Sequence, residues 1–126
     1  MTDGLVTGGK LDPTERAALL CRFPPRWPDP VADHVTFASR SAGSYPLPTE
    51  RRGLIVGRVD DGEGVEALVV KIGGTTDRPD GSTFHITWSL DRARGRRAVQ
   101  SNEVLARLRW EPLPEPIPVT LIPARF

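Results

Sequence analysis

The stretch Phe84-His85-Ile86-Thr87-Trp88 has the alternation of a β-strand with two unlike faces. In an extended chain, successive side chains point to opposite sides. The three apolar residues therefore share one face, and His85 and Thr87 share the other. An apolar face of this kind packs against a core, which leaves an imidazole and a hydroxyl side by side on the opposite surface.

An earlier stretch, His34-Val35-Thr36-Phe37, repeats this arrangement. His34 and Thr36 share one face of the predicted strand, and the two apolar residues share the other. These are the only two histidines in the chain, and each is followed by a threonine two positions later. We therefore expect two strands that carry equivalent polar pairs.

Two imidazoles on neighbouring strands are suited to general acid–base catalysis. Near pH 7, one ring can be neutral and accept a proton while the other is charged and donates one. A threonine hydroxyl beside each ring can hydrogen-bond to a non-bridging phosphate oxygen. The four side chains could thus surround a phosphodiester and hydrolyse it without a metal or other cofactor. A zinc site is a poor alternative, because two histidines and one cysteine fall short of the usual three or four ligands.

The composition indicates a single domain over residues 1–126. The formal net charge of +1 gives no indication of a nucleic-acid binder from bulk electrostatics. A single cysteine excludes an internal disulfide and fits a reducing compartment. The chain has no apolar run of about 18 residues and no secretory signal, so we expect a cytoplasmic protein without a membrane span.

The residue patterns predict a mixture of strands and two helices. The 13 prolines and 12 glycines indicate many turns and argue against an all-helical fold. The most apolar runs lie in a predicted hairpin at 53–60 and 65–72, which we expect at the centre of a sheet. The other predicted elements are a strand at 5–11, a helix at 12–22, a strand at 34–40, a Gly-rich connection at 73–81, a helix from 101 and a last strand at 117–126.

The first helix has a clear start signal. Asp12 can cap it, and Glu15 can reach back in a capping box. We expect Ala17, Leu20 and Cys21 on its buried stripe, with Cys21 as a small core residue rather than a nucleophile.

The second helix and the last strand are predicted from caps and prolines. Ser101 is expected to cap the helix, and Pro112 to end it. Pro118 and Pro123 mark the last strand as the edge of a sheet, because proline cannot donate to a strand ladder. The three tryptophans are expected to be core or loop anchors rather than base-stacking platforms: Trp27, Trp88 and Trp110.

The two His-x-Thr stretches resemble the signature of the 2H phosphoesterase superfamily. The resemblance extends, in order, to the cyclic phosphodiesterase domains of fungal and plant-type tRNA ligases and to their small stand-alone relatives, as far as about Trp110. The similar stretches are Val6-Thr7-Gly8, Leu11-Asp12, the Leu19-Leu20 helix, the Phe-Pro-Pro loop at 23–25, Asp33-His34-Val35-Thr36, the strand at 64–70, His85-Ile86-Thr87 and Val99-Gln100-Ser101-Asn102.

This resemblance implies an α+β, bilobal fold of antiparallel β-sheets with few flanking helices, in which the histidines face each other across a cleft. It also implies metal-independent hydrolysis of 2′,3′-cyclic phosphate ends of RNA or nucleotides, typically to a 2′-phosphate. His34 and His85 would be the acid–base pair, and Thr36 and Thr87 would bind phosphate.

Four further side chains are candidate substrate contacts. Arg40 could meet a distal part of the substrate, and Tyr45 could stack on a base. Arg92 and Arg94 belong to a basic loop at 91–97 that could clamp RNA phosphates, although such a loop is more often a solvated turn.

Two alternatives stay open. The substrate could be another small cyclic or 2′-5′-linked nucleotide, such as a cyclic phosphate on an ADP-ribose derivative, because the motif fixes the chemistry and not the leaving group. The chain could instead be a non-catalytic module that binds RNA ends. We expect a monomer that has no membrane partner, and a functional association with an RNA ligase or kinase stays open.

Overall fold

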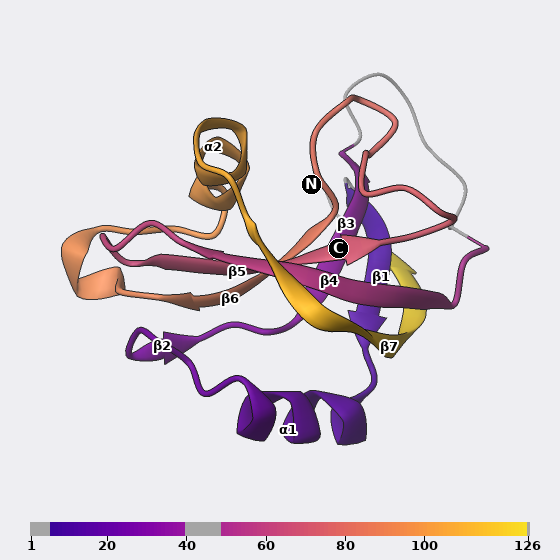
Figure 1. Cartoon of the computed structure of the whole chain (residues 1–126), viewed down its shortest axis with the longest axis horizontal. Coiled ribbons are helices and arrows are strands. Elements are labelled where there is room, and N and C mark those ends of the chain that lie inside the picture. The colour runs from indigo at the N-terminus through magenta and orange to yellow at the C-terminus, as the bar shows by residue number, and fades with distance from the viewer. Residues whose placement is uncertain (1–5, 40–48, 126) are drawn as a thin grey trace.

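A hairpin of two apolar strands forms the centre of the sheet (Figure 1). The computed structural model describes residues 6–39 and 49–125, and it pairs β4 (Arg52–Asp60) with β5 (Val65–Lys71) in antiparallel register. Every residue of β5 except the last is buried, as a strand covered on both faces requires. The predicted central hairpin is therefore confirmed.

The sheet has seven strands, and all their pairings are antiparallel within the described residues. Their order is β2-β6-β5-β4-β7-β1-β3. The sheet curls, because β3 contacts β6 although five steps of the strand order separate them. The remaining strands are β1 (Val6–Leu11), β2 (Asp29–Pro30), β3 (His34–Ser39), β6 (His85–Leu90) and β7 (Glu111–Arg125).

Strand β7 lies inside the sheet, so the predicted edge position of the last strand is wrong. It pairs with β4 on one side and with β1 on the other, but along different parts of its length. The amide of Leu121 donates to the carbonyl of Arg51, the residue before β4. Backbone nitrogens two positions apart in a strand point to the same side, so the nitrogen of Pro123 points toward β4 and away from β1. The nitrogen of Pro118 points away from β4, as does the amide of Thr120. Each proline thus lacks its N–H only where no strand needs it.

Helix α1 (Pro13–Arg22) begins as predicted, with the Asp12 carboxylate accepting from the Glu15 amide at 3.0 Å. Its buried stripe is rotated from the predicted one. Leu19 is buried, whereas Ala17 and Cys21 are exposed and Leu20 is only partly covered. The predicted core role of Cys21 is therefore wrong.

The rotation of α1 has a polar cause. Arg16 faces the protein rather than solvent, because its guanidinium donates to the carbonyls of Ala32 and Val31 at 2.7 and 3.1 Å. Glu15 does not reach back to the cap. Its carboxylate instead accepts from the amide and hydroxyl of Thr120, at 2.6 and 2.7 Å, and so ties α1 to β7.

Helix α2 (Gln100–Arg107) differs from its prediction at both ends. Val99 is the residue before its first turn, and Ser101 lies inside the helix, where it caps nothing. The helix ends at Arg107, and Pro112 already belongs to β7. Residues 108–110 connect the two elements, so the helix ends before it reaches Pro112.

The apolar face of β6 lies in the main core, as predicted. Phe84, Ile86 and Trp88 pack there, with the ring of Phe23 edge-on to Trp88 and its carbonyl accepting from the indole at 2.8 Å. A smaller cluster around Val104 packs α2 onto the sheet. Of the other two tryptophans, Trp27 is a loop anchor, and Trp110 packs partly against this smaller cluster.

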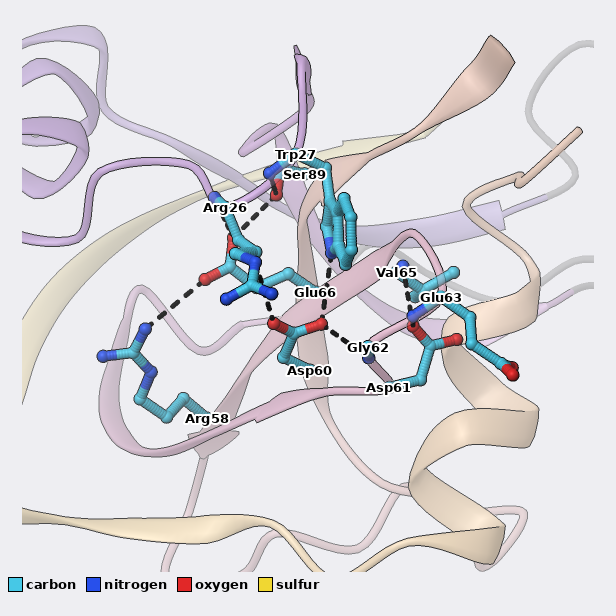
Figure 2. A network of polar contacts seen from close by, with 10 residues as sticks. All are labelled: Arg26, Trp27, Arg58, Asp60, Asp61, Gly62, Glu63, Val65, Glu66 and Ser89. Carbon is cyan, nitrogen blue, oxygen red and sulfur yellow. Dashed lines mark hydrogen bonds and ion pairs between the residues drawn. The ribbon is translucent and has the colours of Figure 1, made fainter. Parts of the chain in front are cut away.

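A buried carboxylate fixes the Pro-rich loop that precedes β2 (Figure 2). Glu66 on β5 is 1% exposed, and its carboxylate accepts from the Arg26 amide at 3.0 Å and from the Ser89 hydroxyl at 2.6 Å. The guanidinium of Arg58 lies 3.5 Å from its other oxygen. Since a buried charge is tolerated only when it is paired and hydrogen-bonded, this network holds the loop in one position.

Within 6–39 and 49–125, neither helix has the length and apolar character needed to cross a lipid bilayer.

Candidate active site

Both His-x-Thr pairs line a single cavity of about 220 Å³. His34 and Thr36 come from β3, and His85 and Thr87 come from β6. These strands are far apart in the sheet order, and the curl of the sheet brings them together. A cavity of this size is below the ~300–1,000 Å³ of sites for drug-sized ligands and suits a small polar group.

A short crossing segment sets the position of His34 relative to β6. The amide of Ala32 donates to the carbonyl of Thr87 at 2.9 Å, and the backbone of Ala32 has a φ of +44°. This left-handed conformation is unfavourable for alanine and turns the chain into β3. The Arg16 guanidinium, bound to the carbonyls of Val31 and Ala32, stabilises that turn.

His85 is almost fully buried, at 6% exposure. Its Nδ1 lies 2.8 Å from the carbonyl oxygen of Thr83. A carbonyl can only accept, so Nδ1 carries the hydrogen and Nε2 of the neutral ring is the bare nitrogen. Arg78 approaches the same Nδ1 at 3.4 Å, which is a contact between two donors and not a hydrogen bond.

The surroundings of His85 favour its neutral form. Burial lowers the pKa of His85 from 6.5 to about 4, and the positive charges of Arg78 and His34 act in the same direction against the Thr83 carbonyl. At pH 7 the ring is therefore neutral, and its Nε2 can accept a proton.

His34 has a different environment. Its side chain is one-third exposed, and its Nδ1 lies 3.0 Å from the carboxylate of Asp33. Because a carboxylate only accepts, Nδ1 of His34 donates, and Asp33 forms an ion pair with the ring whenever it is protonated. The two histidines thus differ in both burial and charge partner.

The two threonines also differ. Thr87 is 9% exposed, and its hydroxyl lies 2.9 Å from that of the fully buried Ser101 and 3.4 Å from the carbonyl of Ala98. Thr36 is half-buried in the cavity wall. Ser101, predicted as a helix cap, instead connects α2 to β6 through Thr87.

Arg78 lines the cavity and was missed by the sequence analysis. It belongs to the connection before β6, which is not an open linker: the Arg78 amide donates to the Ser82 carbonyl at 2.7 Å, and the amide and hydroxyl of Ser82 both donate to Asp80. The Arg-Pro-Asp-Gly turn sequence was the available signal, because a tight turn at 79–81 folds Arg78 back beside the β6 strand.

Two of the predicted substrate contacts, Arg92 and Arg94, lie away from this cavity. Arg92 and Arg94 form the single-turn helix η1 (Arg92–Arg94) beyond the far end of β6 and do not line the cavity. Arg94 pairs with Asp91 at 3.0 Å and lies 5.4 Å above the ring of Trp27. The predicted contacts Arg40 and Tyr45 lie outside the described residues.

The described residues contain no cluster of three or more His, Cys, Asp or Glu side chains that could hold a metal ion. The donors around the cavity are instead two imidazoles, hydroxyls and one guanidinium. This donor set is suited to proton transfer and to binding an anion.

No family model, curated protein or solved structure matches this chain. The resemblance to 2H phosphoesterases is therefore still a prediction from the two His-x-Thr stretches.

Proposed function

We propose that this protein is a metal-independent phosphodiesterase that hydrolyses 2′,3′-cyclic phosphates at RNA ends or on nucleotides and leaves a 2′-phosphate. One observation carries the proposal: the only two histidines of the chain, each with its threonine, line one small cavity. Two structural histidines would have no reason to meet there with equivalent neighbours.

The environments of the rings suggest their roles. His85, neutral and bare at Nε2, is the general base that takes a proton from water, and the water oxygen then attacks phosphorus. The bond from phosphorus to O3′ breaks. His34, ion-paired with Asp33 when protonated, donates a proton to the leaving O3′. The products are a 2′-phosphate and a free 3′-hydroxyl.

Thr36 and Thr87 line the cavity, and in this mechanism their hydroxyls hydrogen-bond the non-bridging phosphate oxygens, where charge grows in the transition state. Ser101 supports this role for Thr87, since the buried contact between the two hydroxyls limits how the threonine side chain can turn.

The bilobal 2H phosphoesterase fold is part of the same proposal. Strand β7 pairs first with β4 and then with β1, so it joins β4–β5–β6 to β1–β3. Each group of strands contributes one His-x-Thr pair. This division supports two lobes with a shared cleft.

The test is hydrolysis of adenosine 2′,3′-cyclic phosphate in excess chelator, with product identified by ³¹P NMR. We expect the wild-type protein to produce the 2′-phosphate, and His34→Ala and His85→Ala each to lower kcat by about 10²–10⁴-fold, the usual contribution of a general acid or base. Cys21→Ser is the control, because Cys21 is exposed on α1 and should be dispensable.

Three outcomes separate the alternatives. Other cyclic or 2′-5′-linked nucleotides, such as an ADP-ribose cyclic phosphate, could be hydrolysed at a higher kcat/KM. That result would assign a different substrate and retain the two-histidine mechanism. Tight binding without product would favour an RNA-end binding module. Undiminished hydrolysis by the His34→Ala, His85→Ala double variant would end the proposal.

A further inference from the structure

Arg78 is a buried arginine that forms no ion pair with a carboxylate of the described residues. The residue as a whole is 8% exposed, and burial lowers the pKa of its guanidinium. None of the ion pairs formed among residues 6–39 and 49–125 involves it. The negative charge of Asp80 raises the pKa of Arg78, but the Asp80 carboxylate accepts hydrogen bonds from Ser82.

Arg96 is an arginine of the same chain whose charge is compensated within the structure. Its side chain is 21% exposed, and its guanidinium lies 2.6 Å from the buried carboxylate of Asp61. Burying a charge is costly unless an opposite charge compensates for it. Arg96 meets this condition through Asp61, and Arg78 does not meet it within the part of the chain that the structure describes.

The guanidinium of Arg78 also keeps unused donors. Its Nε is buried without a hydrogen-bond partner among the described residues, as is the Nε of Arg96, so the two arginines differ in the carboxylate and not in this atom. One terminal nitrogen has only long contacts of 3.3 Å, to the Ser82 hydroxyl and the Asn102 side-chain oxygen, and the other faces the Nδ1–H of His85. A guanidinium is a planar fork of five donors that matches two oxygens of a phosphate.

We propose that Arg78 is the anion-binding residue of the cavity and that its guanidinium holds the phosphate group of the ligand. The inference rests on the proposed function for the identity of the anion, but it concerns binding rather than turnover. It adds a charged contact to the hydroxyls of the two threonines.

A bound anion would also change the electrostatic environment of the His85 ring. The charged groups that face this ring are Arg78 and His34, while Asp80 acts on Arg78 and Asp33 pairs with His34. A phosphate beside Arg78 offsets the positive charge that disfavours protonation of His85. The pKa of His85 should therefore rise when phosphate binds.

The experiment is calorimetric titration with inorganic phosphate and with adenosine 2′-monophosphate. We expect Arg78→Gln to weaken binding of both about 10- to 100-fold, as loss of a charge-assisted contact does. Arg78→Lys should restore part of the affinity. Arg107→Gln removes an exposed arginine from the last turn of α2 and should bind like the wild type.

NMR of the wild-type protein gives a second readout that does not require a variant to fold. The Arg78 Nε–H signal and the ring signals of His85 should shift with phosphate at the same apparent Kd. Unchanged binding by Arg78→Gln, or no shift of the Arg78 signal on saturation, would overturn the proposal. If phosphate binding depends on Arg78 but the protein hydrolyses no cyclic phosphate, the proposed function is refuted and the anion-binding role of Arg78 is supported.

Discussion

At the scale of single residues, the two histidines are alike in sequence and unlike in structure. Each precedes a threonine by two positions, yet His85 is buried with Nδ1 bound to a carbonyl, and His34 is partly exposed with Nδ1 bound to a carboxylate. Local sequence can show that both rings share a face with a hydroxyl. It cannot show which ring is desolvated, because burial depends on segments distant along the chain.

The burial of His85 leads to a prediction for the pH dependence of activity. A base with a pKa of about 4 stays unprotonated well below pH 6.5, so kcat/KM should fall on the acid side only as pH drops through about 4. An acid limb near pH 6.5 would contradict the assignment of His85 as the base. The measurement is kcat/KM for adenosine 2′,3′-cyclic phosphate between pH 3.5 and 9.

Folding must be followed alongside this profile. The unfolded chain protonates His85 near 6.5 and the native protein only near 4, so the unfolded state binds more protons between these values. Stability contributed by the neutral ring is thus lost as pH falls from about 6.5 to about 4. Circular dichroism at each pH separates loss of fold from loss of the base.

Arg78 and Ser101 illustrate why part of the site escaped prediction. The sequence showed the His-x-Thr pairs because alternation along a strand is local. Arg78 reaches the cavity through a turn, and Ser101 reaches Thr87 across 14 positions of chain. The turn at 79–81 can be read from the sequence, but the cavity beside it and the contact of Ser101 with Thr87 depend on how distant elements pack.

At the scale of elements, β1 is the strand that holds the first histidine strand in place. It lies between β7 and β3, and the register pairs Gly8 with Thr36 and Gly9 with Val35. Each glycine permits a close approach: a Cβ on Gly8 would lie 2.0 Å from the carbonyl oxygen of Val35, and one on Gly9 would lie 2.7 Å from Leu121. Side chains at these positions would push the neighbouring strands away.

We therefore expect Gly8→Ala to damage the site without touching substrate. The backbone of Val35 lies between His34 and Thr36, so displacing it moves both side chains, and a misplacement of about 1 Å can cost about 10²-fold in rate. Stability should fall by about 1–3 kcal/mol, as for other overpacked positions.

The control for this variant is Gly53→Ala on β4, where a Cβ would meet only side-chain atoms, the nearest at 3.0 Å. It should keep its kcat/KM. The measurements are kcat/KM and urea unfolding of both variants. Equal kcat/KM for Gly8→Ala and the wild type would contradict the positioning role of β1.

Strand β7 shows the limits of proline as an element signal. The sequence predicted an edge strand because proline lacks a donor, and that inference assumed partners along the whole strand. The structure gives β7 a partner on each side over only part of its length, so Pro118 and Pro123 lie within the ladders with their nitrogens pointing away from the paired strand. The hairpin at the centre was predictable, since its apolar runs and its turn are adjacent in sequence.

At the scale of the whole molecule, the site exists only because the sheet curls. The strands that carry the two His-x-Thr pairs are separated by β5, β4, β7 and β1 in the sheet order, yet they contact each other. Curvature of this kind follows from twist, bulges and packing summed over all strands. Bulges interrupt the pairing of β1 with β3, of β4 with its neighbours and of β5 with β6.

The most direct measurement is a crystal structure of the protein with adenosine 2′-monophosphate, the expected product. The account predicts the phosphate in the cavity, with the Nε2 atoms of His34 and His85 on opposite sides of it and each within hydrogen-bond distance of a phosphate or ribose oxygen. A nucleotide bound elsewhere, or a phosphate that contacts neither imidazole, would contradict the claim that these two rings act on one phosphorus atom.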